Sequence, residues 1–238
     1  MADFLYKKLS NVSKQIKEIL VTKRNNEPID EKAENCFLQL REICGEANDL
    51  EQQYKNDVLS LAKSGMAEIK LLLENKQHCY RLLSSSISLS PKNSAALRLK
   101  GNLLYSDKKH EEALSCFRSA ASIDGKLEVD ANFWMAIGLC LFQLNKFEEA
   151  ETAFSKATNL DNSSDENCVC LIITLLKSKN KNCENNFSKA KTKFAKIIQN
   201  VKTGLSKNPK NPFLLFFAAD FLFYKGEIEK VVFENLER

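Results

Sequence analysis

Two blocks of the sequence between residues 94 and 162 repeat each other at a fixed offset of 37 residues. Small and aromatic residues recur together in the matched pairs Gly101 and Gly138, Ala113 and Ala150, Phe117 and Phe154, and Ala120 and Ala157. Four matches in size and chemistry at one offset are difficult to obtain by chance. The sequence therefore predicts a repeated structural unit, in which each block packs its small and large residues in the same way.

The second block shows how these residues are arranged. It reads Trp134-x-x-Ile137-Gly138-x-x-Leu141, followed by Ala150-x-x-x-Phe154-x-x-Ala157. This pattern resembles the signature of the tetratricopeptide (TPR) repeat, a pair of antiparallel helices A and B. Gly138 and Ala150 are expected where the two helices cross closely, and Trp134 and Phe154 would fill the space beside that crossing. The resemblance implies an all-α fold, a right-handed solenoid of TPR helix hairpins.

The rest of the chain can be divided in the same register. We expect repeats near residues 60–93, 94–127, 131–164, 165–211 and, in part, 212–238, with an insertion in the fourth of these. Residues 1–59 precede the array and are expected to form N-terminal helices that pack on the solenoid. The last repeat ends on apolar residues instead of a polar capping helix, which indicates a fragment of a longer array.

The first 24 residues are expected to form an amphipathic helix, because their apolar residues follow three- and four-residue spacing. This stripe consists of Leu5, Leu9, Val12, Ile16 and Ile19. Packing of the stripe against the next helix is the favoured interpretation, and binding to a membrane surface is the alternative. Asp30 is a candidate N-cap for a second helix that runs to Leu50.

Composition narrows the classes of function. The 35 basic and 31 acidic residues are too nearly balanced to indicate direct binding of nucleic acid. No apolar run reaches the roughly 18 residues of a membrane span, and the first residues do not read as a signal peptide. The eight cysteines then indicate reduced thiols in an intracellular protein. They include no C-x-x-C pair, so no metal site is predicted.

The search for a catalytic site gives no candidate. The sequence contains no Gly-rich phosphate loop, no G-x-S-x-G and no H-E-x-x-H motif. Glu111-Glu112 and Glu148-Glu149 recur at one repeat position, where the positive end of a helix dipole favours acidic residues. His110 occupies an aromatic position between two helices and is expected to pack there. We therefore predict a protein without catalytic residues or cofactors, not an enzyme.

Function is instead expected in the groove of the array. Helix A lines the concave face of a TPR array, and its positions 2, 5, 9 and 12 share one side because three- and four-residue steps stay on one face. The predicted groove residues are Arg98, Asn102, Tyr105, Met135, Leu139, Phe142, Val169, Ile173, Leu176, Phe213, Phe216 and Phe223. From Met135 onward this stripe is apolar, which is typical of an interaction surface. Either a partner segment or the chain's own N-terminal helices could cover it.

Two family resemblances bear on the partner. Arg98 and Asn102 resemble the first half of the carboxylate clamp of heat-shock co-chaperones, which holds the C-terminus of a peptide. The rest of that clamp is missing, because Ala136, Glu166 and Cys170 stand at its other positions. This resemblance implies a cytoplasmic adaptor that captures a peptide C-terminus.

The second resemblance extends over about residues 60–238. The stretches 89–97, 144–157 and 211–226, in this order, are similar to successive repeats of the large TPR scaffold subunits of RNA polymerase II-associated factor (PAF) elongation complexes. The insertion in the repeat at 165–211 also fits that family. The resemblance implies a nuclear protein of transcription elongation that grips extended or helical segments of other protein subunits. It implies no small-molecule substrate and no contact with a membrane.

Overall fold

The computed structural model describes residues 1–24 and 28–161, together with single positions further along the chain. These positions are Ser164, Glu166, Asn167, Cys170, Leu171, Ile173, Thr174, Gln199, Lys202, Thr203 and Ser206. No β-strand occurs among the described residues, so the predicted all-α fold class is confirmed for them. Within the same residues, no helix combines the length and the apolar composition that crossing a membrane requires.

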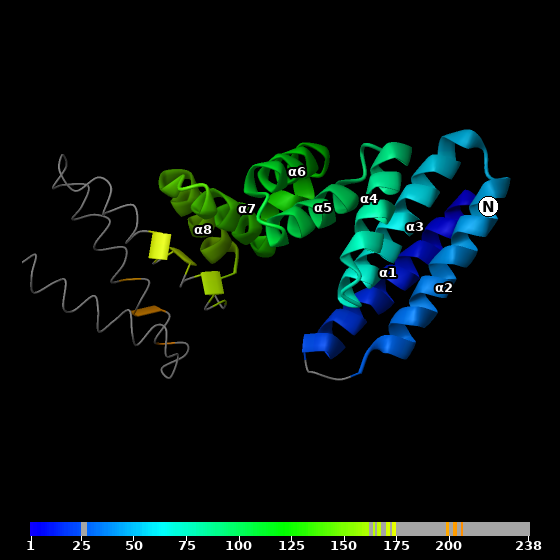
Figure 1. The fold of residues 1–238 in the computed structure, drawn as a ribbon, viewed down its shortest axis with the longest axis horizontal. Coiled ribbons are helices and arrows are strands. Elements are labelled where there is room, and N and C mark those ends of the chain that lie inside the picture. Colours follow the sequence, from blue (N-terminus) through cyan, green and yellow to red (C-terminus); the bar gives the residue numbers. More distant parts are fainter. Residues whose placement is uncertain are drawn as a thin grey trace, which may run out of the picture. The chain divides into compact units, whose positions relative to one another are not determined.

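The chain divides into two compact units, Met1–Leu127 and Glu128–Arg238. The helices of the first unit are α1 (Ala2–Arg24), α2 (Asp30–Glu46), the 3-10 turn η1 (Ala47–Asp49), α3 (Gln52–Leu72), α4 (Lys76–Leu89), α5 (Ser94–Ser106) and α6 (His110–Ile123) (Figure 1). A second 3-10 turn, η2 (Gly125–Val129), follows α6. The described helices of the second unit are α7 (Ala131–Gln143) and α8 (Phe147–Leu160).

From α3 onward the described helices pack in consecutive pairs: α3 with α4, α5 with α6, and α7 with α8. A three-residue turn joins the two helices of each pair. The turns share an unusual backbone, since Glu74, Lys108 and Asn145 adopt positive φ angles of 60°, 62° and 58°. The left-handed residue lets the next amide bond back to the first helix, which is a common way to end a helix. The three hairpins therefore turn by one mechanism.

Helix A carries glycine where the aromatic ring of helix B occupies the space that a Cβ atom would need. A Cβ atom on Gly138 would lie 2.6 Å from Cε1 of Phe154, and one on Gly101 would lie 2.8 Å from Cε1 of Phe117. We expected Gly138 to meet Ala150 at a crossing of two backbones. The three nearest atoms at Gly138 all belong to the Phe154 ring, and Ala150 is fully buried. The repeated pattern thus pairs a glycine with a phenylalanine.

This pairing gives a testable difference between two glycines of the first unit. Gly101→Ala should lower the free energy of unfolding by up to about 2 kcal/mol, because overpacking costs about 1–3 kcal/mol and the better helix propensity of alanine returns roughly 1. Gly45→Ala is the matched control, since a Cβ there meets nothing within 4 Å. That control should be neutral or stabilising. Urea unfolding of both variants measures the difference, and equal effects would contradict the proposed role of the Phe117 ring.

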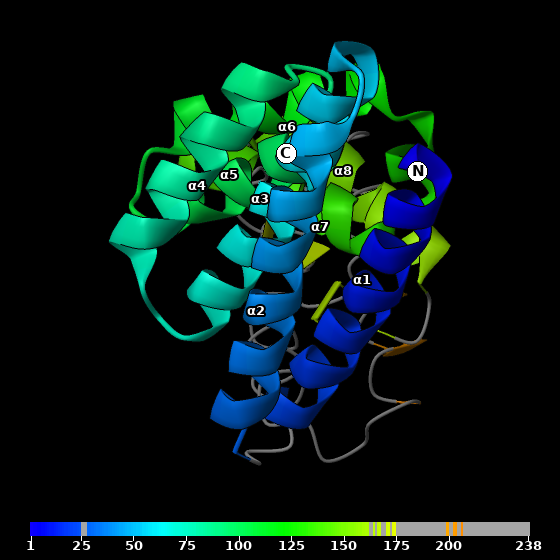
Figure 2. The same cartoon turned by 90° about the vertical axis from the view of Figure 1, so that its right-hand side faces the viewer.

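The N-terminal helices build their own core with α3. The stripe of α1 is buried as predicted: Leu5, Leu9, Val12, Ile16 and Ile19 are all at most 8% exposed. They pack with apolar residues of α2 and α3 in one cluster, and Figures 1 and 2 show α1 and α2 side by side. This packing occupies the apolar face that the membrane alternative requires.

Two predicted helix boundaries in this region are wrong. Ile29 is the N-cap of α2 and Asp30 is its first residue, with no side-chain bond capping the helix. The helix ends at Glu46 and continues as the turn η1, instead of running to Leu50. Asp30 is acidic in the first turn, where the helix dipole favours it without a cap bond. The sequence signal for an acidic helix start was correct, but its position was one residue off.

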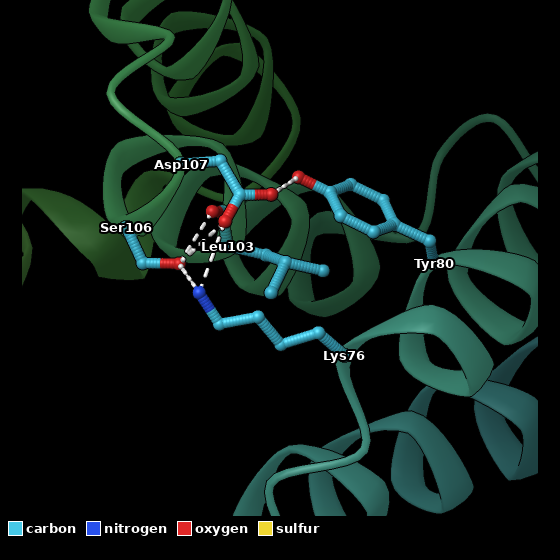
Figure 3. Close-up of polar contacts among 5 residues, drawn as sticks. All are labelled: Lys76, Tyr80, Leu103, Ser106 and Asp107. Atoms are coloured by element: carbon cyan, nitrogen blue, oxygen red, sulfur yellow. Dashed lines mark hydrogen bonds and ion pairs between the residues drawn. The ribbon is translucent and has the colours of Figure 1, made fainter.

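A polar clasp connects α4 to the turn between α5 and α6 (Figure 3). The hydroxyl of Tyr80 donates to Oδ2 of Asp107 at 2.7 Å, and Nζ of Lys76 lies 3.0 Å from Oδ1 of the same carboxylate. Lys76 also donates to Oγ of Ser106 at 3.1 Å. The Tyr80 hydrogen bond, and then the Lys76 hydrogen bond, hold the pKa of Asp107 below its ordinary value. The clasp therefore favours the ionised carboxylate in the folded chain.

This clasp predicts a pH dependence of stability. The folded state has the lower pKa at Asp107, so its stabilising contribution is present above the ordinary carboxyl pKa. It is lost as the pH falls below about 4 and through the folded-state value. Thermal melts should show the wild type more stable than Asp107→Asn near neutral pH, with the difference shrinking in acid. Tyr80→Phe, which removes the main donor, should behave similarly. A gap that stays constant with pH would contradict this role of the carboxylate.

Candidate partner-binding site

A pocket of about 300 Å³ lies between α1, α3 and α5 in the first unit. Tyr6, Ser10 and Ser13 line it from α1, Leu61, Ser64 and Glu68 from α3, and Ala95, Arg98 and Leu99 from α5. The lining therefore combines apolar side chains with several polar and charged groups. Such a combination is typical of sites that bind a ligand group in a fixed orientation.

The pocket coincides with the inner stripe of the first repeats. Positions 2 and 5 of the repeat at 94–127 are Ala95 and Arg98, and both line the pocket. The same spacing applied to residues 60–93 selects Leu61, Ser64 and Glu68, which also line it. We did not name these three from the sequence, because residues 60–93 lack the small and aromatic pattern of the later repeats. The spacing of positions 2, 5 and 9 within a repeat is the sequence signal that identifies Leu61, Ser64 and Glu68.

A buried polar network fixes α3, α4 and α5 around this pocket. Asn93 caps α5, its Oδ1 accepting from the amide of Ala96 at 3.0 Å. Its Nδ2 lies 2.9 Å from Oγ of Ser60, 3.3 Å from Oγ of Ser64 and 3.2 Å from Oγ of Ser86. Buried polar groups that satisfy one another in this way specify a single arrangement of helices. One member, Ser64, also faces the pocket, so the network sets the geometry of the pocket wall.

Glu68 is the acidic residue of the pocket lining. Burial raises its pKa, and the nearby charges of Arg98 and Lys17 offset this only in part. With a raised folded-state pKa, the chain is more stable when Glu68 is protonated and loses that stability as the pH rises through this pKa. A charged Glu68 at neutral pH is therefore a cost to the fold. Desolvated charges of this kind are concentrated at functional sites.

The structure places the predicted groove residues of α5 in different surroundings. Arg98 is half-buried in the pocket, whereas Asn102 is exposed. Tyr105 is half-buried against His110, with ring centroids 5.2 Å apart, which agrees with the packing role expected for that histidine. Since α1 forms one wall of the pocket, the N-terminal helices do border this end of the stripe. They leave a hollow there instead of filling it.

In the second unit, the predicted residues of α7 share a half-exposed face. Met135, Leu139 and Phe142 are half-buried, while Phe133 and Leu141 on the other face are buried. The ring of Phe142 packs edge-on against Phe147 of α8 at 5.5 Å. Ile173 is also half-buried and helical. The remaining predicted groove residues, Val169, Leu176, Phe213, Phe216 and Phe223, lie outside the described residues.

The described residues contain no group of three or more His, Cys, Asp or Glu side chains that could hold a metal ion. Cys36, Cys44, Cys79, Cys116, Cys140 and Cys170 are free thiols. Burial raises the pKa of Cys140 to about 12 and that of Cys79 to about 11, so these two are protonated and weak nucleophiles at neutral pH. Their surroundings agree with packing roles in the helix core.

Comparison with known sequences supports the repeat class. Residues 69–157 match the family model of the anaphase-promoting complex, cyclosome, subunit 3. The chain is also 25% identical, over 143 residues, to the RNA polymerase-associated protein CTR9 of Saccharomyces cerevisiae. This match covers 60% of the chain but only 13% of the length of CTR9.

Solved structures show the same fold. YrrB, described as a TPR protein with an unusual peptide-binding site, superposes with a TM-score of 0.58 at 13% identity, over 92% of this chain and 100% of YrrB. The MamA 41-end structure from Desulfovibrio magneticus RS-1 has a TM-score of 0.55 at 17% identity, over 83% and 97% of the two chains. The APC/C hetero-tetramer Cut9-Hcn1 also has a TM-score of 0.55, at 13% identity, over 93% of this chain and 46% of the other.

The helix pairs, the family model and these structures define a TPR protein. TPR folds generally bind peptide or protein partners, and the described helices of this chain share that fold. Within that class, it resembles CTR9, as the order of its repeats predicted.

Proposed function

We propose that this chain is an assembly scaffold of a PAF-type transcription-elongation complex, acts in the nucleus and is not an enzyme. The observation that carries the proposal is the similarity to CTR9, which extends over 143 residues. In this proposal residues 60–238 form the repeat array and residues 1–59 pack against its first helices. The partners are extended or helical segments of other protein subunits, not nucleic acid, small molecules or membranes.

The half-exposed face of α7 supports the proposed binding mode. Met135, Leu139 and Phe142 present long, adaptable apolar side chains that are neither fully buried nor fully exposed. Methionine and aromatic residues in such positions are frequent carriers of binding energy. We propose that this face is part of one groove with the other predicted residues from Val169 to Phe223.

The alternative function, a cytoplasmic adaptor that captures a peptide C-terminus, is less well supported by the structure. A carboxylate clamp needs its basic residue available for the peptide. Arg98 is half-buried in the pocket and acts on Glu68, whose carboxylate is a competing partner. A peptide carboxylate arriving there would also meet the charge of Glu68, and like charges in contact are costly.

Affinity purification separates the two functions. The tagged chain is incubated with nuclear extract, with and without an excess of a heat-shock C-terminal peptide, and the captured proteins are identified by mass spectrometry. The proposal expects subunits of a transcription-elongation complex, retained in the presence of the peptide. Capture that the peptide abolishes would support the adaptor. Absence of every elongation-complex subunit would contradict the proposed function.

A further inference from the structure

We propose that Ser90 is a phosphorylation site, at which the phosphate takes the place that an aspartate holds in the hairpins α5–α6 and α7–α8. Ser90 directly follows α4, in the sequence Ser90-Pro91-Lys92. It is the only serine or threonine of the 238 residues that precedes a proline. Modification at this position goes beyond the proposed function, and it does not depend on which partner the array binds.

Ser90 and two aspartates occupy the same structural position in three hairpins. Asp124 follows α6 and Asp161 follows α8, so each of the three residues is the C-cap of its helix B. Their backbones agree, with φ and ψ of −141° and 99° at Ser90, −125° and 96° at Asp124, and −127° and 90° at Asp161. Their amides each donate to the carbonyl four residues earlier, at 3.0, 3.0 and 2.9 Å. Ser90 is therefore the uncharged member of a set whose other two members are acidic.

The contacts of Asp124 show what an acidic group meets at this position. Its Oδ1 accepts from the backbone amide of Lys126 at 3.0 Å, and its Oδ2 accepts from Oγ of Ser94 at 3.4 Å. A bond from an aspartate to the amide two residues further on is common in turns. The turn after Ser90 has the same form. The carbonyl of Ser90 accepts from the amide of Asn93 at 3.1 Å, and the carbonyl of Asp124 accepts from the amide three residues further on at the same distance.

The turn after Ser90 therefore offers partners to a phosphate. Lys92 stands two residues after Ser90, as Lys126 stands two residues after Asp124, so its amide is placed to donate to an anion on Ser90. Phosphoserine carries a charge of about −1.5 to −2 near neutral pH and three acceptor oxygens. The helix dipole normally opposes a phosphate at the end of a helix. The aspartates after α6 and α8 indicate that this position accepts an anion, because the backbone there is extended and has left the helix.

The segment around Ser90 is accessible to a kinase. Pro91 and Lys92 are exposed and Ser90 is half-buried. Pro91 restricts Ser90 to an extended backbone, so less of the chain must unfold to enter an active-site cleft than for a serine inside a helix.

The enzyme that fits this segment is a proline-directed serine/threonine kinase with ATP as the phosphoryl donor. A bond forms between Oγ of Ser90 and the γ-phosphorus of ATP, and the bond from that phosphorus to the oxygen bridging the β-phosphate breaks. ADP leaves, and the hydroxyl proton passes to a base of the kinase. The products are phosphoserine at residue 90 and ADP.

Incubation of the folded chain with a mitogen-activated protein kinase and ATP tests the site. Tandem mass spectrometry should find phosphate on Ser90, and Ser90→Ala should lose this phosphorylation. Ser88→Ala is the matched control, because Ser88 is exposed near the end of α4 but precedes Leu89 instead of a proline. This control should keep full phosphorylation. The site would be overturned by absence of phosphate on Ser90, by equal incorporation into Ser90→Ala, or by incorporation only after the chain is unfolded in urea.

Two measurements on the phosphorylated chain test where the phosphate lies. The backbone amide signal of Lys92 in heteronuclear NMR spectra should move downfield, because the amide donates to an anion. The melting temperature should not fall, since the turns after α6 and α8 hold an acidic residue at the same position. Ser90→Asp, which introduces that residue directly, should also keep the fold and the melting temperature. An unchanged Lys92 signal, or melting several degrees lower in the phosphorylated chain, would overturn the placement of the phosphate at the aspartate position.

Discussion

Phe154→Ala is expected to lower the free energy of unfolding by about 3–5 kcal/mol, the usual range for deleting a buried aromatic side chain. The ring is 1% exposed and lies directly over Gly138. Glycine has no side chain that could move into the space, so the cavity would be only partly filled by relaxation. Removing the ring should therefore cost more than loss of apolar contact alone.

Denaturant unfolding followed by helix circular dichroism measures this effect. Phe4→Ala is a suitable control, because Phe4 is 59% exposed on α1 and its removal leaves no cavity. The control should change stability by less than about 1 kcal/mol, as surface substitutions usually do. If Phe154→Ala and Phe4→Ala had the same small effect, the pairing of helix A glycine with helix B phenylalanine would not hold the hairpin together.

The pairing of a helix A glycine with a helix B phenylalanine also explains why part of this fold could be predicted from the sequence. Gly101 and Gly138, with Phe117 and Phe154, fix a local contact between helices that are close in sequence, so the repeat pattern was sufficient to predict α5 to α8. The physical reason for the glycines was not predictable in detail. The pattern states that a position must be small, but it does not state which neighbour requires it.

The N-terminal region was predicted less completely. The stripe from Leu5 to Ile19 identified the buried face of α1, since apolar spacing reports burial directly. What that face contacts depends on packing between helices, and the sequence favoured packing against the next helix with membrane binding as the alternative. The start of α3 at Gln52 likewise depends on tertiary contacts that propensity does not report.

The pocket shows where sequence reasoning about function was incomplete. The apolar stripe from Met135 onward indicates an interaction groove, whereas a single polar position such as Glu68 carries no comparable signal in the sequence. A carboxylate on a helix normally indicates a solvated face, and only its burial beside Arg98 makes it a candidate site. Burial of this kind arises where α1, α2, α3 and α5 meet, and no spacing rule within one repeat predicts such a meeting of helices.

Replacing Leu139 and Phe142 together by aspartate is expected to abolish capture of the partner while leaving the helices folded. Both side chains are half-buried on α7 in the described structure, so aspartate at these positions can still reach water. A truncated hot-spot residue costs about 2 kcal/mol or more of binding free energy, and a desolvated carboxylate adds to that cost. Two such changes in one face should therefore reduce binding beyond detection.

Matched variants separate binding from folding. Phe142 packs on Phe147 and so contributes to the hairpin, which makes Met135→Asp with Leu139→Asp a useful second pair that leaves this contact intact. Thr152→Asp with Asn159→Asp, at exposed positions of α8, adds the same charge elsewhere and should preserve capture. Thermal melts and affinity purification are performed on the same preparations. Loss of the fold in both α7 pairs would identify the stripe as internal core, and full capture by folded variants would place the partner on another face.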